Sequence, residues 1–368
     1  MQRILSLGLM GAVGYVAYLF LQGGGIQPGT NGTRAIPGVP AGGVSSHYQT
    51  PGNWNAPPRE STPPANNSPI YQPASTGGAA IQPPGQPNSG PVIRIASFNI
   101  QDFGNRKAGK DYVMLRLADI VRKFDVVAIQ EVNTSNDYLI PNFMQLVNQP
   151  GGNLPPRRYD YVIGPRLGRS SSNLEQYVYV FDTDRIELDP QSVYTISDPD
   201  DLMHREPYVA TFMTKGVHPD EAFTFTLINV HTDPNSRDLA IELDALAEVY
   251  RVVRRSARQE DDVIVLGDLN ADDRHFQRLG QLPGIFPLIA GVWTNTRQDK
   301  QYDNLIIHQP STTEWTGRSG VFDVMRHYNL TEQQALELSD HFPVWAEFSV
   351  YERDYAGRVA NRRYPLNR

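Results

Sequence analysis

The 368-residue chain has no cysteine, which excludes disulfides, thiolate nucleophiles and zinc–thiolate sites. Charge is scarce near the N-terminus: residues 22–91 contain 13 Gly and 14 Pro but only three charged side chains. A segment of this composition cannot bury enough apolar surface to offset its chain entropy. We therefore predict an unfolded linker over residues 23–91, one folded domain over residues 92–350 and a basic tail over residues 351–368.

The net charge is distributed unevenly along the chain. The whole chain carries −7, residues 1–91 carry +2 and residues 351–368 carry +3, which leaves −12 for the predicted domain. A domain this acidic is not a general surface for polyanions. If it acts on nucleic acid, it needs local basic contacts and a divalent cation.

An uncharged apolar stretch of 18 residues, Ile4–Leu21, follows Arg3. Such a stretch is typical of a signal peptide or a short membrane anchor. Because no small-x-small cleavage motif follows it, we favour an uncleaved signal anchor over residues 1–22, ahead of a cleaved signal peptide and of an internal segment. We expect an exported protein, membrane-anchored or secreted, whose folded domain is extracytoplasmic.

Apolar periodicity within residues 92–350 predicts a mixed α/β domain and leaves its topology open. Apolar residues recur at helical spacing in Asp111–Phe124 and between Leu239 and Val253, which predicts two amphipathic helices. Runs rich in β-branched and aromatic residues predict strands at Val92–Asn99, Asp125–Gln130, Gln176–Asp182, Tyr208–Thr214, Phe223–Val230, Asp262–Leu266 and Phe342–Val350.

Polar side chains border several of these apolar runs. They are Asn99, Glu131, His231, Asp268 with Asn270, and Asp340 with His341. A polar group at the end of a buried strand is rigid and partly desolvated, so its pKa shifts easily. Each residue alone also fits a turn or a hydrogen-bonded core position, but their combination favours one site. Oxygen ligands beside imidazoles suit Mg²⁺ or Mn²⁺ rather than zinc.

The motifs, in their order, resemble those of the endonuclease/exonuclease/phosphatase superfamily. They are FNIQDFG at residues 98–104, IQEV at 129–132, GDLNAD at 267–272, YDN at 302–304 and SDHFP at 339–343. REP at residues 205–207 is similar to the deoxyribonuclease I branch. The resemblance implies a four-layer αββα sandwich of two mixed β-sheets flanked by helices, with the motif residues gathered at one edge.

The resemblance also implies residue roles. The implied metal ligands for Mg²⁺ or Mn²⁺ are Glu131, helped by Asn99, Asp340 and Asp268. The implied acid–base pair is His231, oriented by Glu175, and His341, oriented by Asp303. The implied contacts to substrate are Asp268 and Asn270 beside the scissile phosphate, Arg205 on a phosphate, and Arg169 nearby.

The requirements of phosphodiester hydrolysis agree with this set of residues. The reaction needs a base for water, an acid for the leaving oxygen and neutralisation of phosphate charge. Two histidines, each with a carboxylate behind it, and a metal site meet these needs. We take His341 as the base and His231 as the acid, and the sequence leaves the reverse assignment open.

Two further features bear on ligands. Asp198, Asp200, Asp201 and Glu206 form an acidic loop that either holds a structural Ca²⁺ or is simply solvated. Where the deoxyribonuclease I branch carries arginine after FNI and QEV, this chain has Gln101 and Asn133. Loss of those basic groups weakens the case for tight binding to duplex DNA.

The sequence supports one leading function and two alternatives. The leading hypothesis is a metal-dependent DNA endonuclease of low sequence specificity, a hydrolase. One alternative is a phosphodiesterase of the same superfamily that acts on phospholipid head groups or inositol phosphates. The other is a catalytically idle, surface-anchored binding module. No protein partner is predicted.

Overall fold

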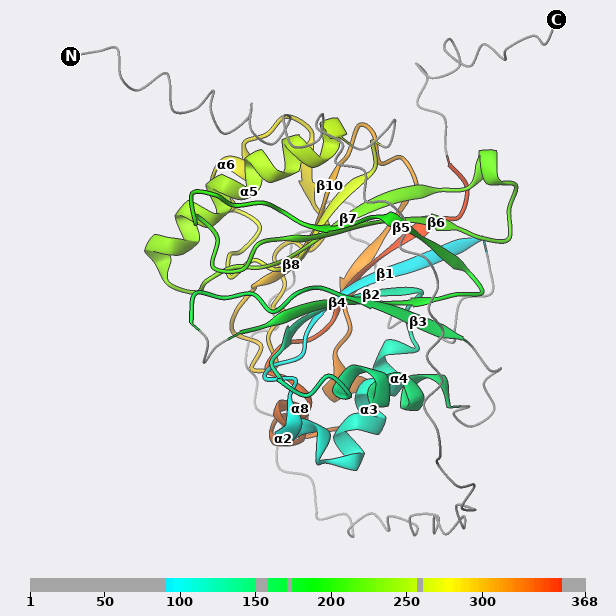
Figure 1. Ribbon diagram of the computed structural model, residues 1–368, viewed down its shortest axis with the longest axis vertical. Helices are drawn as coiled ribbons and strands as arrows, with labels where there is room; N and C mark the ends of the chain where they lie inside the picture. Colours follow the sequence, from blue (N-terminus) through cyan, green and yellow to red (C-terminus); the bar gives the residue numbers. More distant parts are fainter. Residues whose placement is uncertain (1–90, 150–157, 171–173, 257–260, 353–368) are drawn as a thin grey trace, which may run out of the picture. The chain divides into compact units, whose positions relative to one another are not determined.

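The computed structural model describes residues 91–149, 158–170, 174–256 and 261–352 (Figure 1). The predicted anchor, linker and basic tail lie outside these residues, apart from Pro91 and the first two residues of the tail. Within the described ranges, no helix combines the length and the apolar character that crossing a membrane requires. The prediction for Ile4–Leu21 concerns residues outside these ranges and stays a prediction.

Twelve strands of the described residues form two six-stranded sheets. The first has the order β11-β12-β1-β2-β4-β3, with bounds Trp315–Val321, Val344–Ser349, Val92–Asn99, Val126–Val132, Gln176–Asp182 and Tyr159–Ile163. The second has the order β5-β6-β7-β8-β10-β9, with bounds Ile186–Thr195, Tyr208–Thr214, Thr224–His231, Val263–Asp268, Asp303–His308 and Ile285–Pro287. The pairs β1–β2 and β7–β8 are parallel and the other named pairs are antiparallel, so both sheets are mixed.

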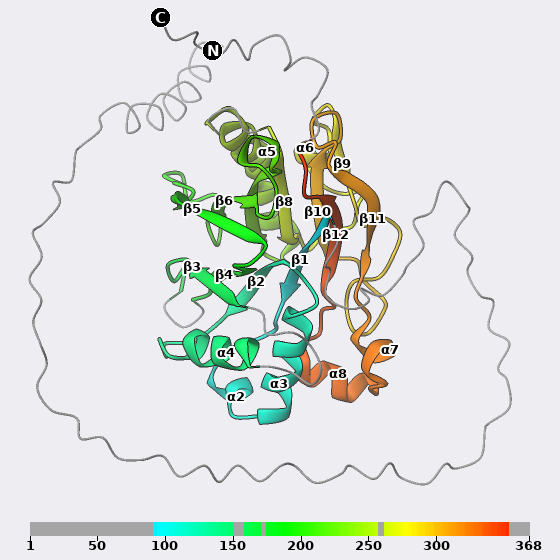
Figure 2. The same cartoon turned by 90° about the vertical axis from the view of Figure 1, so that its right-hand side faces the viewer.

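Helices cover the outer face of each sheet, which completes the four layers that the family resemblance implied (Figures 1 and 2). The first sheet is covered by α2 (Asn105–Ala108), α3 (Asp111–Val121), α4 (Leu139–Asn148), α7 (Val324–Tyr328) and α8 (Glu332–Leu338). The second is covered by α5 (Ser236–Ser256) and α6 (Gln277–Gly280), and a 3₁₀ turn spans Pro219–Glu221. The predicted fold class is confirmed.

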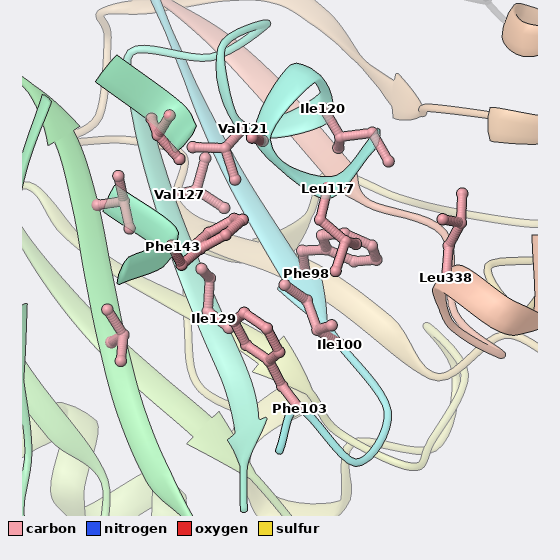
Figure 3. Close-up of a cluster of buried hydrophobic side chains, with 14 of the residues drawn as sticks. Phe98, Ile100, Phe103, Leu117, Ile120, Val121, Val127, Ile129, Phe143 and Leu338 are labelled. Atoms are coloured by element: carbon pink, nitrogen blue, oxygen red, sulfur yellow. The ribbon is translucent and has the colours of Figure 1, made fainter. Parts of the chain in front are cut away.

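Three buried clusters hold these layers together. Outside the first sheet, Phe98 and Ile129 pack against Leu117 and Val121 of α3 and against Phe143 of α4 (Figure 3). A second cluster fills the space between the sheets, and a third lies under α5. The helical spacing seen in the sequence therefore marks the buried faces of α3 and α5.

Gly267 allows two strands of the second sheet to pair closely up to the polar residues at their ends. Gly267 has φ +150°, and a Cβ there would lie 1.9 Å from the carbonyl oxygen of Val230. A side chain would push apart β7 and β8, whose last paired residues are His231 and Asp268. Glycine is required here for close approach of the two backbones.

Candidate active site

The ends of five strands bring predicted residues to one edge of the sandwich. In the first sheet, Asn99 ends β1 and pairs with Gln130 of β2, directly before Glu131. In the second sheet, Asp268 pairs with both His231 and Asp303. Asn99 Nδ2 donates to Asp268 Oδ2 at 2.9 Å, so the two sheets are joined at this point.

Glu131 is held from two sides. Asn99 Nδ2 donates to its Oε1 at 2.8 Å, and the backbone N–H of Asp102 donates to its Oε2 at 2.9 Å. Its backbone is left-handed, with φ +60°, where β2 bulges against β4. A non-glycine residue in this conformation is often found at functional sites.

His231 and Glu175 form the first imidazole–carboxylate pair. Nδ1 of His231 lies 2.7 Å from Glu175 Oε2, and Nε of the buried Arg205 approaches the same oxygen at 3.2 Å. Burial lowers the pKa of His231, but the hydrogen bond with Glu175 and the charge of Asp268 outweigh it, so that this pKa is raised. Burial raises the pKa of Glu175, but His231 and Arg205 outweigh it and the pKa is lowered. The carboxylate therefore stays ionised behind the imidazole.

His341 and Asp303 form the second pair. Nδ1 of His341 lies 2.8 Å from Asp303 Oδ2, which also accepts a hydrogen bond from Thr294 Oγ1 at 2.7 Å. The ring of Tyr302 lies 5.8 Å from that of His341. Burial lowers the pKa of His341, but the charges of Asp303 and Asp268 outweigh it and raise the pKa to about 10.

Asp268 stands between the two imidazoles. Its Oδ2 lies 3.6 Å from Nε2 of His231 and 3.5 Å from Nε2 of His341. Burial raises the pKa of Asp268, but the two histidines outweigh it, so that this pKa is lowered. The proton-carrying atoms of both histidines therefore converge on one point, and the carboxylates behind them fix which nitrogen faces it.

Asn270 lies beside this centre, in a turn that Asp268 stabilises. Asp268 Oδ1 accepts the backbone N–H of Asn270 at 3.0 Å, and Asn270 Nδ2 donates to the carbonyl oxygen of Thr232 at 2.8 Å. Its left-handed φ of +45° fits the tolerance of asparagine for this region. Asn270 is thus bonded through its backbone to the last residue of β8 and through its side chain to the loop that follows β7.

The arginines expected to contact substrate lie differently. Arg205 is 6% exposed and its contact in the structure is with Glu175. Arg169 pairs with Asp201 at 3.4 Å and donates to the carbonyl oxygen of that residue, and no contact with the two histidine pairs is seen among the described residues. A direct contact of either arginine with a substrate phosphate stays a prediction.

The oxygen atoms at this edge suit a hard cation. Oδ1 of Asn99 and Oδ1 of Asp340 are buried and have no hydrogen-bond partner among the described residues, as expected of ligand atoms. Ligand atoms of Asp268, Asp303 and His341 also lie within 4.8 Å of one another. The residues present therefore fit a divalent cation, while the donor set leaves its identity open.

The acidic loop does not form a comparable arrangement. The other such group among the described residues is Asp261, Asp262 and Glu352, and it includes no member of the loop. Asp198 Oδ2 instead accepts the backbone N–H of Met203 at 2.6 Å. The structural Ca²⁺ stays a prediction.

Sequence reasoning missed two residues that support the site. Thr294 Oγ1 bonds Asp303, and Nε2 of Gln101 donates to Asp340 Oδ2 at 3.0 Å. Thr294 carries no motif, and Gln101 drew notice only as a missing arginine. The backbone bridge between Asn295 and His341, which brings Thr294 to the site, joins segments 46 positions apart that no local pattern connects.

Comparison with known proteins gives consistent matches. The model of the endonuclease/exonuclease/phosphatase family matches residues 96–341, and this range contains every predicted site residue. Deoxyribonuclease-1-like 1 of Sus scrofa is 34% identical over 287 residues, which cover 75% of this chain and 84% of that protein. The Homo sapiens protein of the same name is 33% identical, covering 72% and 86%. Deoxyribonuclease gamma of Rattus norvegicus is 31% identical, covering 68% and 83%.

Proposed function

The chain belongs to the deoxyribonuclease I-like branch of the endonuclease/exonuclease/phosphatase family, and we propose from this that it is a divalent-metal-dependent DNA endonuclease of low sequence specificity. The observation that carries the proposal is the convergence of two imidazoles on one carboxylate. Nε2 of His231 and Nε2 of His341 lie 3.6 and 3.5 Å from Asp268 Oδ2. In the proposed function, one of these imidazoles acts as the acid and the other as the base.

In the proposed reaction, neutral His341 accepts a proton from the attacking water at Nε2. Asp303 holds Nδ1 of His341 at 2.8 Å and stabilises the imidazolium that forms. His231, held by Glu175, donates its Nε2 proton to the leaving oxygen. A divalent cation held by Glu131, Asn99 and Asp340 would neutralise charge on the phosphate.

The raised pKa of His341 has a consequence for this assignment. The carboxylates of Asp303 and Asp268 raise the pKa of the His341 imidazole well above its usual value. A base must be neutral at the working pH. A divalent cation bound nearby would oppose the carboxylate charges and lower this pKa, which is why we pair the base role of His341 with metal dependence.

The test is nicking of supercoiled plasmid DNA by the purified protein with Mg²⁺ or Mn²⁺. We expect His341→Ala to reduce the rate by roughly 10²–10⁴-fold, because one acid–base group is lost. Glu131→Ala should also remove most activity while near-UV circular dichroism stays unchanged. The matched control is His218→Ala, which removes a histidine that is 68% exposed and outside the site.

The alternatives give different results in the same experiment. Release of phosphocholine from sphingomyelin without nicking of DNA would favour the lipid phosphodiesterase. Absence of hydrolysis for every phosphodiester would favour the binding module. Persistent metal-dependent nicking by Glu131→Ala would contradict the metal site.

We also propose, from the sequence, an extracytoplasmic location with attachment through the N-terminal segment.

A further inference from the structure

Glu242 is a fully buried acidic residue of α5, with 0% of its surface exposed. Both of its carboxylate oxygens accept backbone N–H groups from outside the helix. The N–H of His204 donates to Oε1 and that of Asp233 donates to Oε2, each at 2.6 Å. Hydrogen bonds of an ionised carboxylate to backbone N–H groups are among the stronger ones in proteins.

The two amides belong to segments that carry groups of the site. His204 directly precedes Arg205, and Asp233 follows His231 by two residues. A second bond ties the same segments together, since Nδ1 of His204 lies 2.8 Å from Asp233 Oδ2. Glu242 therefore links two loops, at His204 and Asp233, that are 29 positions apart in the chain. We call this pair of hydrogen bonds the bracket.

The two linked loops carry Arg205 and His231, which both contact Glu175. Nε of Arg205 and Nδ1 of His231 approach the same oxygen, Glu175 Oε2, at 3.2 and 2.7 Å. Movement of either loop would change the distances of Arg205 and His231 from that oxygen. We propose that Glu242 is a positioning residue that fixes Arg205 and His231 around Glu175 through the backbone of the two loops. The inference rests on the proposed function, because it assigns Glu242 to the proposed catalytic groups.

A role limited to packing explains the geometry less well. Burial of a carboxyl group disfavours folding unless its oxygens are satisfied, and an apolar residue would fill the same position on α5 without that cost. Here both oxygens are used, and both partners lie at the site loops rather than in α5. The arrangement is that expected of groups which must be held within a fraction of an ångström.

The test is a double-mutant cycle on the full-length protein. Glu242→Gln keeps the shape, but its amide offers one acceptor and one donor, so one of the two N–H groups loses its partner. We expect kcat/KM on plasmid DNA to fall roughly 10- to 100-fold, as for a small misplacement of catalytic groups. In an Arg205→Ala background the same change should cost less, by roughly 3-fold or more, because one of the two groups that it positions is already absent. Glu248→Gln, an exposed position of the same helix, is the matched control.

Equal effects in both backgrounds, or full activity of Glu242→Gln, would overturn the proposal. If Glu242→Gln does not fold, Asp233→Asn weakens the bond to His204 and serves in the same cycle. Hydrogen exchange separates this inference from the proposed function. Loss of protection at the His204 amide, at the Asp233 amide or at both in Glu242→Gln, but not in Glu248→Gln, supports the bracket even if the wild type cleaves no DNA. Unchanged protection there contradicts it.

Discussion

Gln101 shows how a single side chain can adjust the cation site. Its Nε2 donates to Asp340 Oδ2 at 3.0 Å, and its backbone N–H donates to Ser339 Oγ at 3.1 Å. One oxygen of Asp340 is thereby fixed, while Oδ1 stays buried without a hydrogen-bond partner among the described residues. A group that orients a ligand in this way commonly affects metal affinity by about 10- to 100-fold.

We therefore expect Gln101→Ala to weaken Mn²⁺ binding by roughly 10-fold, because Asp340 becomes free to rotate. Calorimetric titration of the full-length protein with Mn²⁺ measures this directly and does not depend on turnover. Gln309→Ala, at an exposed glutamine outside the site, is the control. An unchanged Mn²⁺ affinity would mean that the Gln101–Asp340 bond has no role in metal binding.

The sequence predicted those site residues that are marked by a local pattern, such as the end of a buried strand. It did not predict residues whose role depends on a distant part of the chain. Asn99, His231 and Asp268 end buried strands, and the structure joins them within hydrogen-bonding or ion-pair distance. Thr294 could not be found in this way, because its role depends on a loop that returns to Asp303. For Arg205 the resemblance implied a phosphate contact, and the structure shows an ion pair with Glu175 that no sequence pattern marks.

Among the elements, the strands that were predicted are all largely buried, although the buried β10 was not predicted. β1, β7 and β8 are almost wholly buried, so their continuous apolar runs stand out in the sequence. β5 and β11 are half exposed at sheet edges, and the pairing of each is interrupted by a register shift. Neither an apolar run nor a clean alternation marks them, so sequence reasoning missed both.

The contact between α2 and α8 carries a prediction on pH. Lys107 is buried, and its Nζ donates to the carbonyl oxygen of Leu338, the last residue of α8 before the SDH motif. A lysine at a helix C-terminus satisfies an unpaired carbonyl and opposes the helix dipole. Burial lowers the pKa of Lys107 from 10.5 to about 8, although nearby carboxylates oppose this.

Between pH 8 and 10.5 the unfolded chain therefore holds this proton more often than the folded one. The free energy of unfolding then rises with pH in this window. Relative to Lys107→Met, the wild type should gain at most about 3 kcal/mol from pH 8 to 10.5, since one pKa unit corresponds to about 1.4 kcal/mol. Urea denaturation at several pH values measures the difference, with Lys110→Met as a half-exposed neighbouring control. A difference that stays constant or shrinks with pH would contradict the burial of this charge.

For the whole molecule, the acidity of residues 92–350 is partly explained by the site. Glu131, Glu175, Asp268, Asp303 and Asp340 gather at one edge, where imidazoles and the proposed cation offset their charge. Most lysine and arginine pairs elsewhere among the described residues are exposed and contribute little to stability. Substrate affinity is then expected to depend on the cation rather than on a basic surface.

The boundary of the folded unit provides the last prediction, because β1 begins close to the end of the predicted linker. The backbone N–H of Val350 donates to the carbonyl oxygen of Pro91, and Val92 pairs with Ser349 of β12. A protein that starts at Pro91 keeps these contacts, so it should match the full-length chain in denaturation midpoint and in plasmid nicking. One that starts at Ala96 loses the fully buried Ile93 and Ile95 and should be less stable by several kcal/mol, at about 1.5–3 kcal/mol for each buried side chain. Guanidinium denaturation of both proteins measures the difference in stability. Cell fractionation tests the predicted anchor, because we expect only the full-length chain to be found with membranes. Loss of folding in the protein that starts at Pro91 would show that residues before it belong to the fold.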